Sequence, residues 1–261
     1  MIPAGLESVE QQLLVWMLAM IRPGAAFLAA PMFGAGSVPV QLRLVLALAV
    51  GIPSAAAANM TLPVAGIVSV PGFFMIVAEI VAGLALGFVI QIALAAALVA
   101  GEAISNAMGL GFASMADPST GNASPAVGQF LSMLAMFLFL AADGHLALIA
   151  TIAESYRALP PGAAWLSFST IGGITKFGSL AFAAALSIAL PVGFALVLVQ
   201  IIMAMIARSA PTLNLFAVGM PAALLAGILL LGMATPVMAD TISHTIRLAL
   251  DQAQLIGGGG V

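Results

Sequence analysis

The chain has 261 residues, of which 63% are hydrophobic and only 6% are charged. Soluble domains carry about a quarter of their residues as charged side chains, so this composition excludes an ordinary soluble protein. The net charge of −3 excludes a nucleic-acid-binding surface, and the lack of cysteine excludes disulfides, thiolate metal sites and cysteine nucleophiles. The sequence therefore predicts a protein of the lipid bilayer.

Six apolar runs are long enough to cross a bilayer as helices, which takes about 18 or more residues. Gly, Pro, Ser, Asn and Asp fill the breaks between the runs, as expected of connecting turns. Transmembrane β-barrels have alternating segments of about ten residues instead. We therefore predict an all-α membrane protein of about six long helices, broken by Pro and Gly and arranged as hairpins. The predicted spans are Leu13–Phe33, Val40–Ala58, Phe73–Ala100, Val127–Ile152, Lys176–Ile206 and Leu213–Met238.

The first run follows acidic and not basic residues, so we expect it to remain in the mature protein. It contains Arg22, whose insertion into a membrane costs about 2.5–3.5 kcal/mol. Intramembrane charges are normally paired, and Glu79 and Glu102 are the acids near other runs before the central loop. We predict that one of them pairs with Arg22. The alternative is a break at Arg22–Pro23 that lets the guanidinium reach water.

The third run carries a four-residue repeat of polar and glycine residues, formed by Glu79, Gly83, Gly87 and Gln91. Its two glycines make a GxxxG pattern, which lets two helix backbones approach closely in a membrane. The polar side chains at either end could form hydrogen bonds across such a contact. We predict a helix-packing face here and not a ligand site.

The segment MGLGFASMADPSTGNASP at 108–125 interrupts the apolar chain. Its glycines restrict the backbone little, and its Asp-Pro pair is typical of a turn. Its Phe and Met are apolar groups that could close a narrow passage by excluding water. The residues alone favour a plain loop between helices, with a movable seal over 109–127 as the alternative.

Residues suited to catalysis are few, namely Ser114, Asp117, His145 and His244. The chain has neither a G-x-S-x-G elbow nor an H-E-x-x-H pair. Two histidines a hundred residues apart are a poor metal-ligand set, and we expect Asp143–His145 to cap a helix break instead. The sequence therefore predicts no enzyme activity, no cofactor and no metal.

The C-terminal part carries polar residues on one helical stripe, namely Asp240, Ser243, His244, Arg247 and Asp251. This pattern predicts an amphipathic end helix that lies at an interface. The final GGGGV is expected to be flexible. We predict a single integral-membrane domain over residues 1–256 and a Gly-rich tail over 257–261.

Four stretches, in order along nearly the whole chain, resemble one family. Ala207–Pro221, ARSAPTLNLFAVGMP, resembles the signature of the FliR family, the R subunits of the flagellar type III export apparatus. The central MGLGFASMADPSTG, the helix and turn at Phe137–Pro160 and the Arg/Pro pattern at Arg22–Val50 are also similar to that family. The signature residues are Arg208, Pro211, Asn214, Phe216, Gly219 and Pro221. Glu102 and Thr212 depart from the family pattern, in which glutamine is expected.

The resemblance implies a core subunit of the flagellar type III export gate, multi-pass in the bacterial inner membrane and part of the flagellar basal body. It implies assembly with FliP- and FliQ-type subunits, contact with the large export-gate membrane proteins and passage of unfolded flagellar proteins. It also implies that 109–127 plugs the pore at rest, which reverses the preference for a plain loop. The implied plug residues are Gly109, Leu110, Gly111, Phe112, Met115, Asp117, Pro118 and Gly121.

Three alternatives to this function remain open. One is the equivalent subunit of a virulence-type injectisome. Another is a secondary transporter or channel, because APMFGAGSVP near Ala30 faintly echoes APTLNLFAVGMP near Ala210. The third is an intramembrane hydrolase, which would require Ser114 or Asp117 for cleavage.

Overall fold

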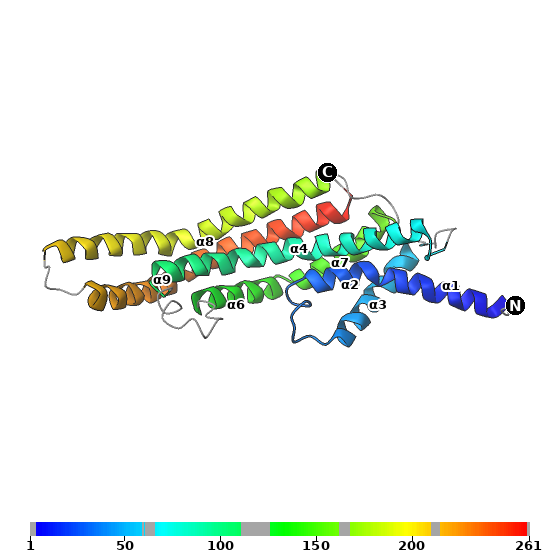
Figure 1. The fold of residues 1–261 in the computed structure, drawn as a ribbon, viewed down its shortest axis with the longest axis horizontal. Helices are drawn as coiled ribbons and strands as arrows, with labels where there is room; N and C mark the ends of the chain where they lie inside the picture. The colour runs from blue at the N-terminus through cyan, green and yellow to red at the C-terminus, as the bar shows by residue number, and fades with distance from the viewer. Residues whose placement is uncertain are drawn as a thin grey trace. The chain divides into compact units, whose positions relative to one another are not determined.

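The structure, a computed structural model, describes residues 4–58, 60, 66–110, 126–161, 168–209 and 215–259. These residues form helices and turns and contain no strand, which confirms the prediction of an all-α membrane protein (Figure 1). The helices are α1 (Ala4–Ala19), α2 (Ile21–Ala29), α3 (Val40–Ala57), α4 (Val70–Ala107), α6 (Ala126–Ala141), α7 (Gly144–Ala158), α8 (Phe168–Ser209) and α9 (Leu215–Gly257).

Two of the six predicted runs are each divided into two helices. The first run becomes α1 and α2, which are separated at Met20. Pro23 has no backbone N–H, so the carbonyl four residues earlier loses its helical partner there. The run Val127–Ile152 becomes α6 and α7. They are separated near Asp143, whose φ of 52° is left-handed, which confirms the predicted helix break. Asp143 is the N-cap residue of α7, but its side chain makes no capping hydrogen bond.

Three helices are longer than their predicted spans. The lengths of α4, α8 and α9 are 38, 42 and 43 residues. At 1.5 Å per residue they extend about 57–65 Å, roughly twice the hydrocarbon thickness of a bilayer. Prolines that we expected to mark breaks lie inside α8 and α9 without ending them, since neighbouring groups in a helical membrane protein can satisfy the freed carbonyls.

The predicted C-terminal end helix is not a separate element, because α9 continues through it as one helix. The stripe itself is present. Asp240, His244 and Arg247 are exposed, whereas Ile242 and Ile246 on the other side are buried. The helix also enters the predicted flexible tail by one residue.

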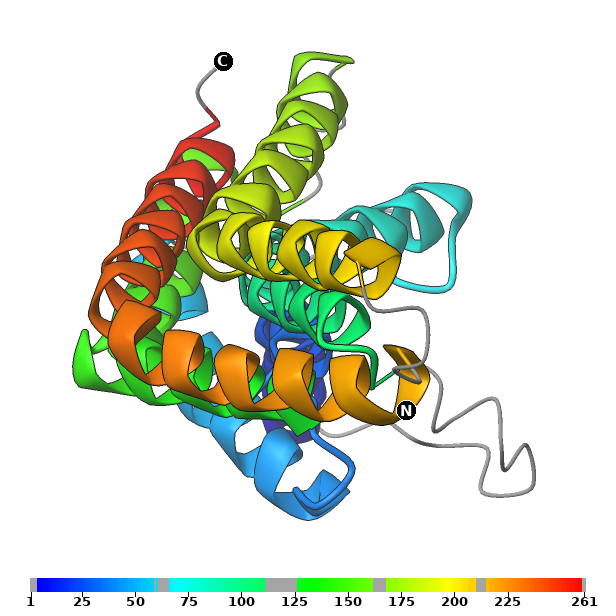
Figure 2. The same ribbon diagram turned by 90° about the vertical axis from the view of Figure 1, so that its left-hand side faces the viewer.

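Contacts divide the chain into two compact units. Unit 1 comprises residues 1–92, 142–178 and 247–261, and unit 2 comprises 93–141 and 179–246. In unit 1, α3 contacts α1, α2 and α7 (Figure 1). The core of this unit includes Leu18, Phe27 and Ile152. In unit 2, the yellow end of α8 and the orange start of α9 both lie near the end of α4 (Figure 2). A single domain over 1–256 stays a prediction.

Candidate functional site

Among the described residues of unit 1, the most buried charged side chains are those of Arg22 on α2 and Glu79 on α4, which form a pair. Both side chains are fully buried. Nε of Arg22 donates to Oε2 of Glu79 at 2.9 Å, and Nη2 donates to Oε1 at 2.8 Å. This two-bonded geometry matches the planar guanidinium to the carboxylate. The partner of Arg22 is therefore Glu79 and not Glu102, which is exposed, and the guanidinium does not reach water.

Helix α7 completes the surroundings of Arg22. Nη1 of Arg22 donates to Oγ of Ser155 at 2.9 Å, and Nη2 donates to the carbonyl of Leu159 at 2.9 Å. The guanidinium carbon lies 4.2 Å from the ring centroid of Tyr156, within cation–π range. Four of the five guanidinium N–H groups are thus bonded, and three helices meet at one charge.

Tyr156 also supplies a hydrogen bond to the backbone carbonyl left free at the break between α1 and α2. Pro23 cannot donate to the carbonyl of Ala19, which would otherwise be left without a partner inside an apolar protein. The hydroxyl of Tyr156 donates to that carbonyl at 2.7 Å. Gly51 of α3 lies against the same carbonyl, where a Cβ would overlap it. The break that the sequence places at Pro23 is therefore held from two neighbouring helices.

The predicted packing face on α4 lies against the backbone of α2. A Cβ at Gly83 would overlap the carbonyl of Arg22, and a Cβ at Gly87 would overlap the carbonyl of Ala26. The glycines thus bring α4 near enough for Glu79 to reach Arg22. Gln91 is exposed and lines a separate recess with residues near the end of α2.

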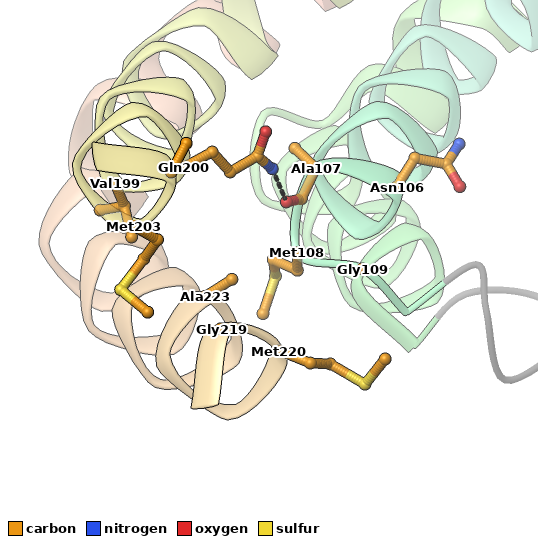
Figure 3. A pocket seen from close by; sticks show the side chains of 11 residues that line it. Asn106, Ala107, Met108, Gly109, Val199, Gln200, Met203, Gly219, Met220 and Ala223 are labelled. Atoms are coloured by element: carbon orange, nitrogen blue, oxygen red, sulfur yellow. Dashed lines mark hydrogen bonds between the residues drawn. The ribbon is translucent and has the colours of Figure 1, made fainter. Parts of the chain in front are cut away.

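Unit 2 contains a pocket of about 270 Å³. It lies where the end of α4 faces α8 and α9 (Figure 3). Its methionines are Met108, Met203 and Met220, and its side-chain amides are those of Asn106 and Gln200. Flexible, polarizable methionines suit a surface that must adapt to different apolar groups.

The end of α4 closes with a left-handed glycine cap. Gly109 has φ of 83°, which glycine adopts without strain. Its N–H donates to the carbonyl of Asn106, and the N–H of Leu110 donates to the carbonyl of Ser105. These two bonds satisfy carbonyls that a helix end leaves free. Gly109 and Leu110 are the only two of the predicted plug residues within the described part of the chain; Gly111, Phe112, Met115, Asp117, Pro118 and Gly121 lie outside it.

The signature residues lie partly in the same unit. Arg208 is exposed near the end of α8, Pro221 is exposed within α9, and Gly219 lines the pocket beside Gly109. The backbone of Phe216 belongs to α9, but its side chain is outside the described residues, as are Pro211 and Asn214. One signature residue, Gly219, therefore lines the same pocket as Gly109, the first residue of the predicted plug.

The groups considered for catalysis are not brought together in the described residues. No cluster of three His, Asp or Glu side chains that could hold a metal ion occurs among them. Ser114 and Asp117 lie outside the described part of the chain. Nδ1 of His145 is buried without a hydrogen-bond partner among the described groups.

Sequence reasoning missed Ser155, Tyr156 and Gln200. Ser155 lies 133 residues from Arg22 along the chain, and Tyr156 lies 137 residues from Ala19. Tyr156 is the only tyrosine in the sequence, which was the one available signal, because a buried tyrosine hydroxyl usually finds a hydrogen-bond partner.

The fold and these interactions define a multi-pass helical membrane protein whose buried polar groups join its own helices. The chain belongs to the family described as bacterial export proteins, family 1, whose profile matches residues 13–249. It is 33% identical to the flagellar biosynthetic protein FliR of Escherichia coli (strain K12) over 92% of each chain. It is also 33% identical to FliR of Pectobacterium carotovorum subsp. carotovorum over 88% of each chain. FliR of Bacillus subtilis (strain 168) is 27% identical over 90% of this chain and 92% of its own. The resemblance to the FliR family is confirmed.

Proposed function

We propose that the chain is a core subunit of the flagellar type III protein export gate in the bacterial inner membrane. With FliP- and FliQ-type subunits it forms the pore for unfolded flagellar proteins, and it contacts the large membrane proteins of the same apparatus. Membership of an export family and similarity to FliR proteins over most of the chain support this proposal.

The observation that carries the proposal is the length of exposed apolar surface along α8. Large exposed apolar side chains run along α8 from Leu180 to Ile206, including Phe182 at 74% and Met205 at 66% exposure. This stretch extends about 39 Å along the helix axis, whereas the hydrocarbon core of a bilayer is about 30 Å thick. Lipid covers that length only if the helix tilts or kinks or the bilayer thickens locally. Apolar surfaces of sister subunits cover it without tilt, which favours a multi-subunit assembly.

The plug assignment for 109–127 is part of this proposal. The left-handed cap at Gly109 ends α4 beside a methionine-lined pocket, so the segment begins among apolar groups that exclude water. Glycine at the first position gives the chain freedom to change direction where it leaves the helix.

Purification tests the partnership. When the tagged chain is purified from its own cells in mild detergent, FliP- and FliQ-type subunits are expected to accompany it, and mass spectrometry identifies them. A self-sufficient transporter of small solutes would instead purify alone and move its substrate in vesicles that contain this chain only. That result would overturn the export-gate proposal.

Deletion tests the plug. Cells in which the chain lacks Leu110–Gly121 are expected to leak ions at rest, measured as loss of membrane potential or as growth inhibition at raised ion concentration. The control is a chain of native length in which the same positions carry a Gly/Ser linker, which keeps the connection but removes Phe112 and Met115. Leakage in both variants supports a seal made by these side chains, and wild-type tightness in both contradicts it.

A further inference from the structure

Three contacts in unit 2 fix the place where α4 ends. The glycine cap pairs the carbonyls of Ser105 and Asn106, whereas no backbone N–H of the described residues donates to the next carbonyl, that of Ala107. The side chain of Gln200 on α8 fills this gap, since its Nε2 donates to the Ala107 carbonyl at 2.8 Å (Figure 3). A residue 93 positions later in the chain thus completes the helix end.

Met108 is the second contact. Its side chain is 2% exposed. A Cβ added to Gly227 of α9 would lie 2.6 Å from Cγ and 2.6 Å from Cε of Met108, which is closer than packed atoms approach. The missing side chain of Gly227 therefore provides the space that Met108 occupies.

The third contact joins the two helices on either side of the central segment. A Cβ at Gly101 of α4 would lie 2.5 Å from Cα of Gly128 at the start of α6. The two backbones meet there directly, because neither residue has a side chain. The helix ends that flank the segment are therefore held together within unit 2.

We propose that Gln200 and Gly227 are positioning residues that set where the seal of the gate begins. The inference rests on the proposed function of 109–127 as the plug. Neither residue belongs to that segment. Gln200 fixes the last turn of α4 by its hydrogen bond, and Gly227 fixes it by giving room to Met108, so α4 ends at a defined point.

Two variants and two matched controls test the proposal in the assembled complex. Gln200→Met keeps the shape of the side chain but removes the donor, and Gln41→Met makes the same change at an exposed glutamine of α3. Gly227→Ala places a methyl group that overlaps the Met108 side chain. Gly232→Ala is its control, because Gly232 lies on the same helix and a Cβ there meets nothing within 4 Å. All four are compared with the Leu110–Gly121 deletion.

Two measurements are made on each variant: backbone hydrogen exchange at residues 108–110 in the purified complex, and resting ion leakage in cells. Gln200→Met and Gly227→Ala are expected to speed exchange roughly two- to tenfold, as the loss of about one hydrogen bond predicts, and to raise leakage. The controls are expected to match wild type in both measurements.

The remaining outcomes separate the two proposals. If the deletion leaks but Gln200→Met shows wild-type exchange or wild-type tightness, the positioning role is wrong and the plug stands. If the deletion itself does not leak, the plug proposal fails, and this inference fails with it.

Discussion

Replacing Arg22 by leucine is expected to lower the free energy of unfolding by about 3–5 kcal/mol, because Glu79 is then left buried without its counter-charge. Glu79→Leu is expected to cost a similar amount by leaving the guanidinium unpaired. The loss is large since both side chains are fully buried and Arg22 also holds Ser155 of α7 and the carbonyl of Leu159, the residue that follows α7. Chemical unfolding in mixed detergent micelles, followed by circular dichroism, measures it.

The double variant Arg22→Leu/Glu79→Leu is the decisive comparison. With both charges removed, no unpaired ion remains, so the double variant is expected to be more stable than either single variant. Tyr156→Phe is a milder control, because it removes the hydroxyl that caps the Ala19 carbonyl and leaves the ion pair in place; we expect a loss of about 1–3 kcal/mol. Strictly additive effects of Arg22→Leu and Glu79→Leu would contradict the pairing.

Substitution of the α4 glycines is expected to have the second-largest effect. Gly83→Ala and Gly87→Ala each place a methyl group where it overlaps the backbone of α2, and we expect a loss of about 1–3 kcal/mol from each. The double variant is expected to lose less than the sum, because one displacement of α2 makes room for both methyl groups. Unfolding in mixed micelles measures these losses.

Glycines in open positions provide the control for this prediction. A Cβ at Gly193 of α8 meets nothing within 4 Å. Gly193→Ala is therefore expected to be neutral or slightly stabilising, because alanine has the higher helix propensity by about 1 kcal/mol. If Gly83→Ala and Gly193→Ala behave alike, the packing face on α4 does not hold α2.

The spans could be predicted from the sequence because length and apolarity are local properties. Every predicted run coincides with one or two helices of the structure. Helix ends were harder to predict. Proline ended a helix at the first run but not within α8 or α9. The difference depends on whether neighbouring groups satisfy the freed carbonyl, and those neighbours are distant in sequence.

In the candidate sites too, some features could be predicted from the sequence and others could not. A lone arginine in an apolar run predicts either a partner or a break that lets the guanidinium reach water, since an unpaired charge there is costly. The choice of Glu79 over Glu102 depended on which part of α4 meets α2, and the close backbone contacts at Gly83 and Gly87 place α2 beside the Glu79 end of that helix. Gln200 had no sequence signal at all, because its only visible role is to bond a carbonyl that the fold brings to it.

The sequence by itself determined that this is an α-helical membrane protein whose first apolar run contains an arginine that needs either a counter-charge or a route to water, because an unpaired charge in an apolar run is costly. Only the tertiary structure decided which carboxylate, hydroxyl and carbonyls surround Arg22, and which amide caps the end of α4. Those pairings join residues far apart in the chain, and hydrogen bonds form only between groups that helix packing has already brought within about 3 Å.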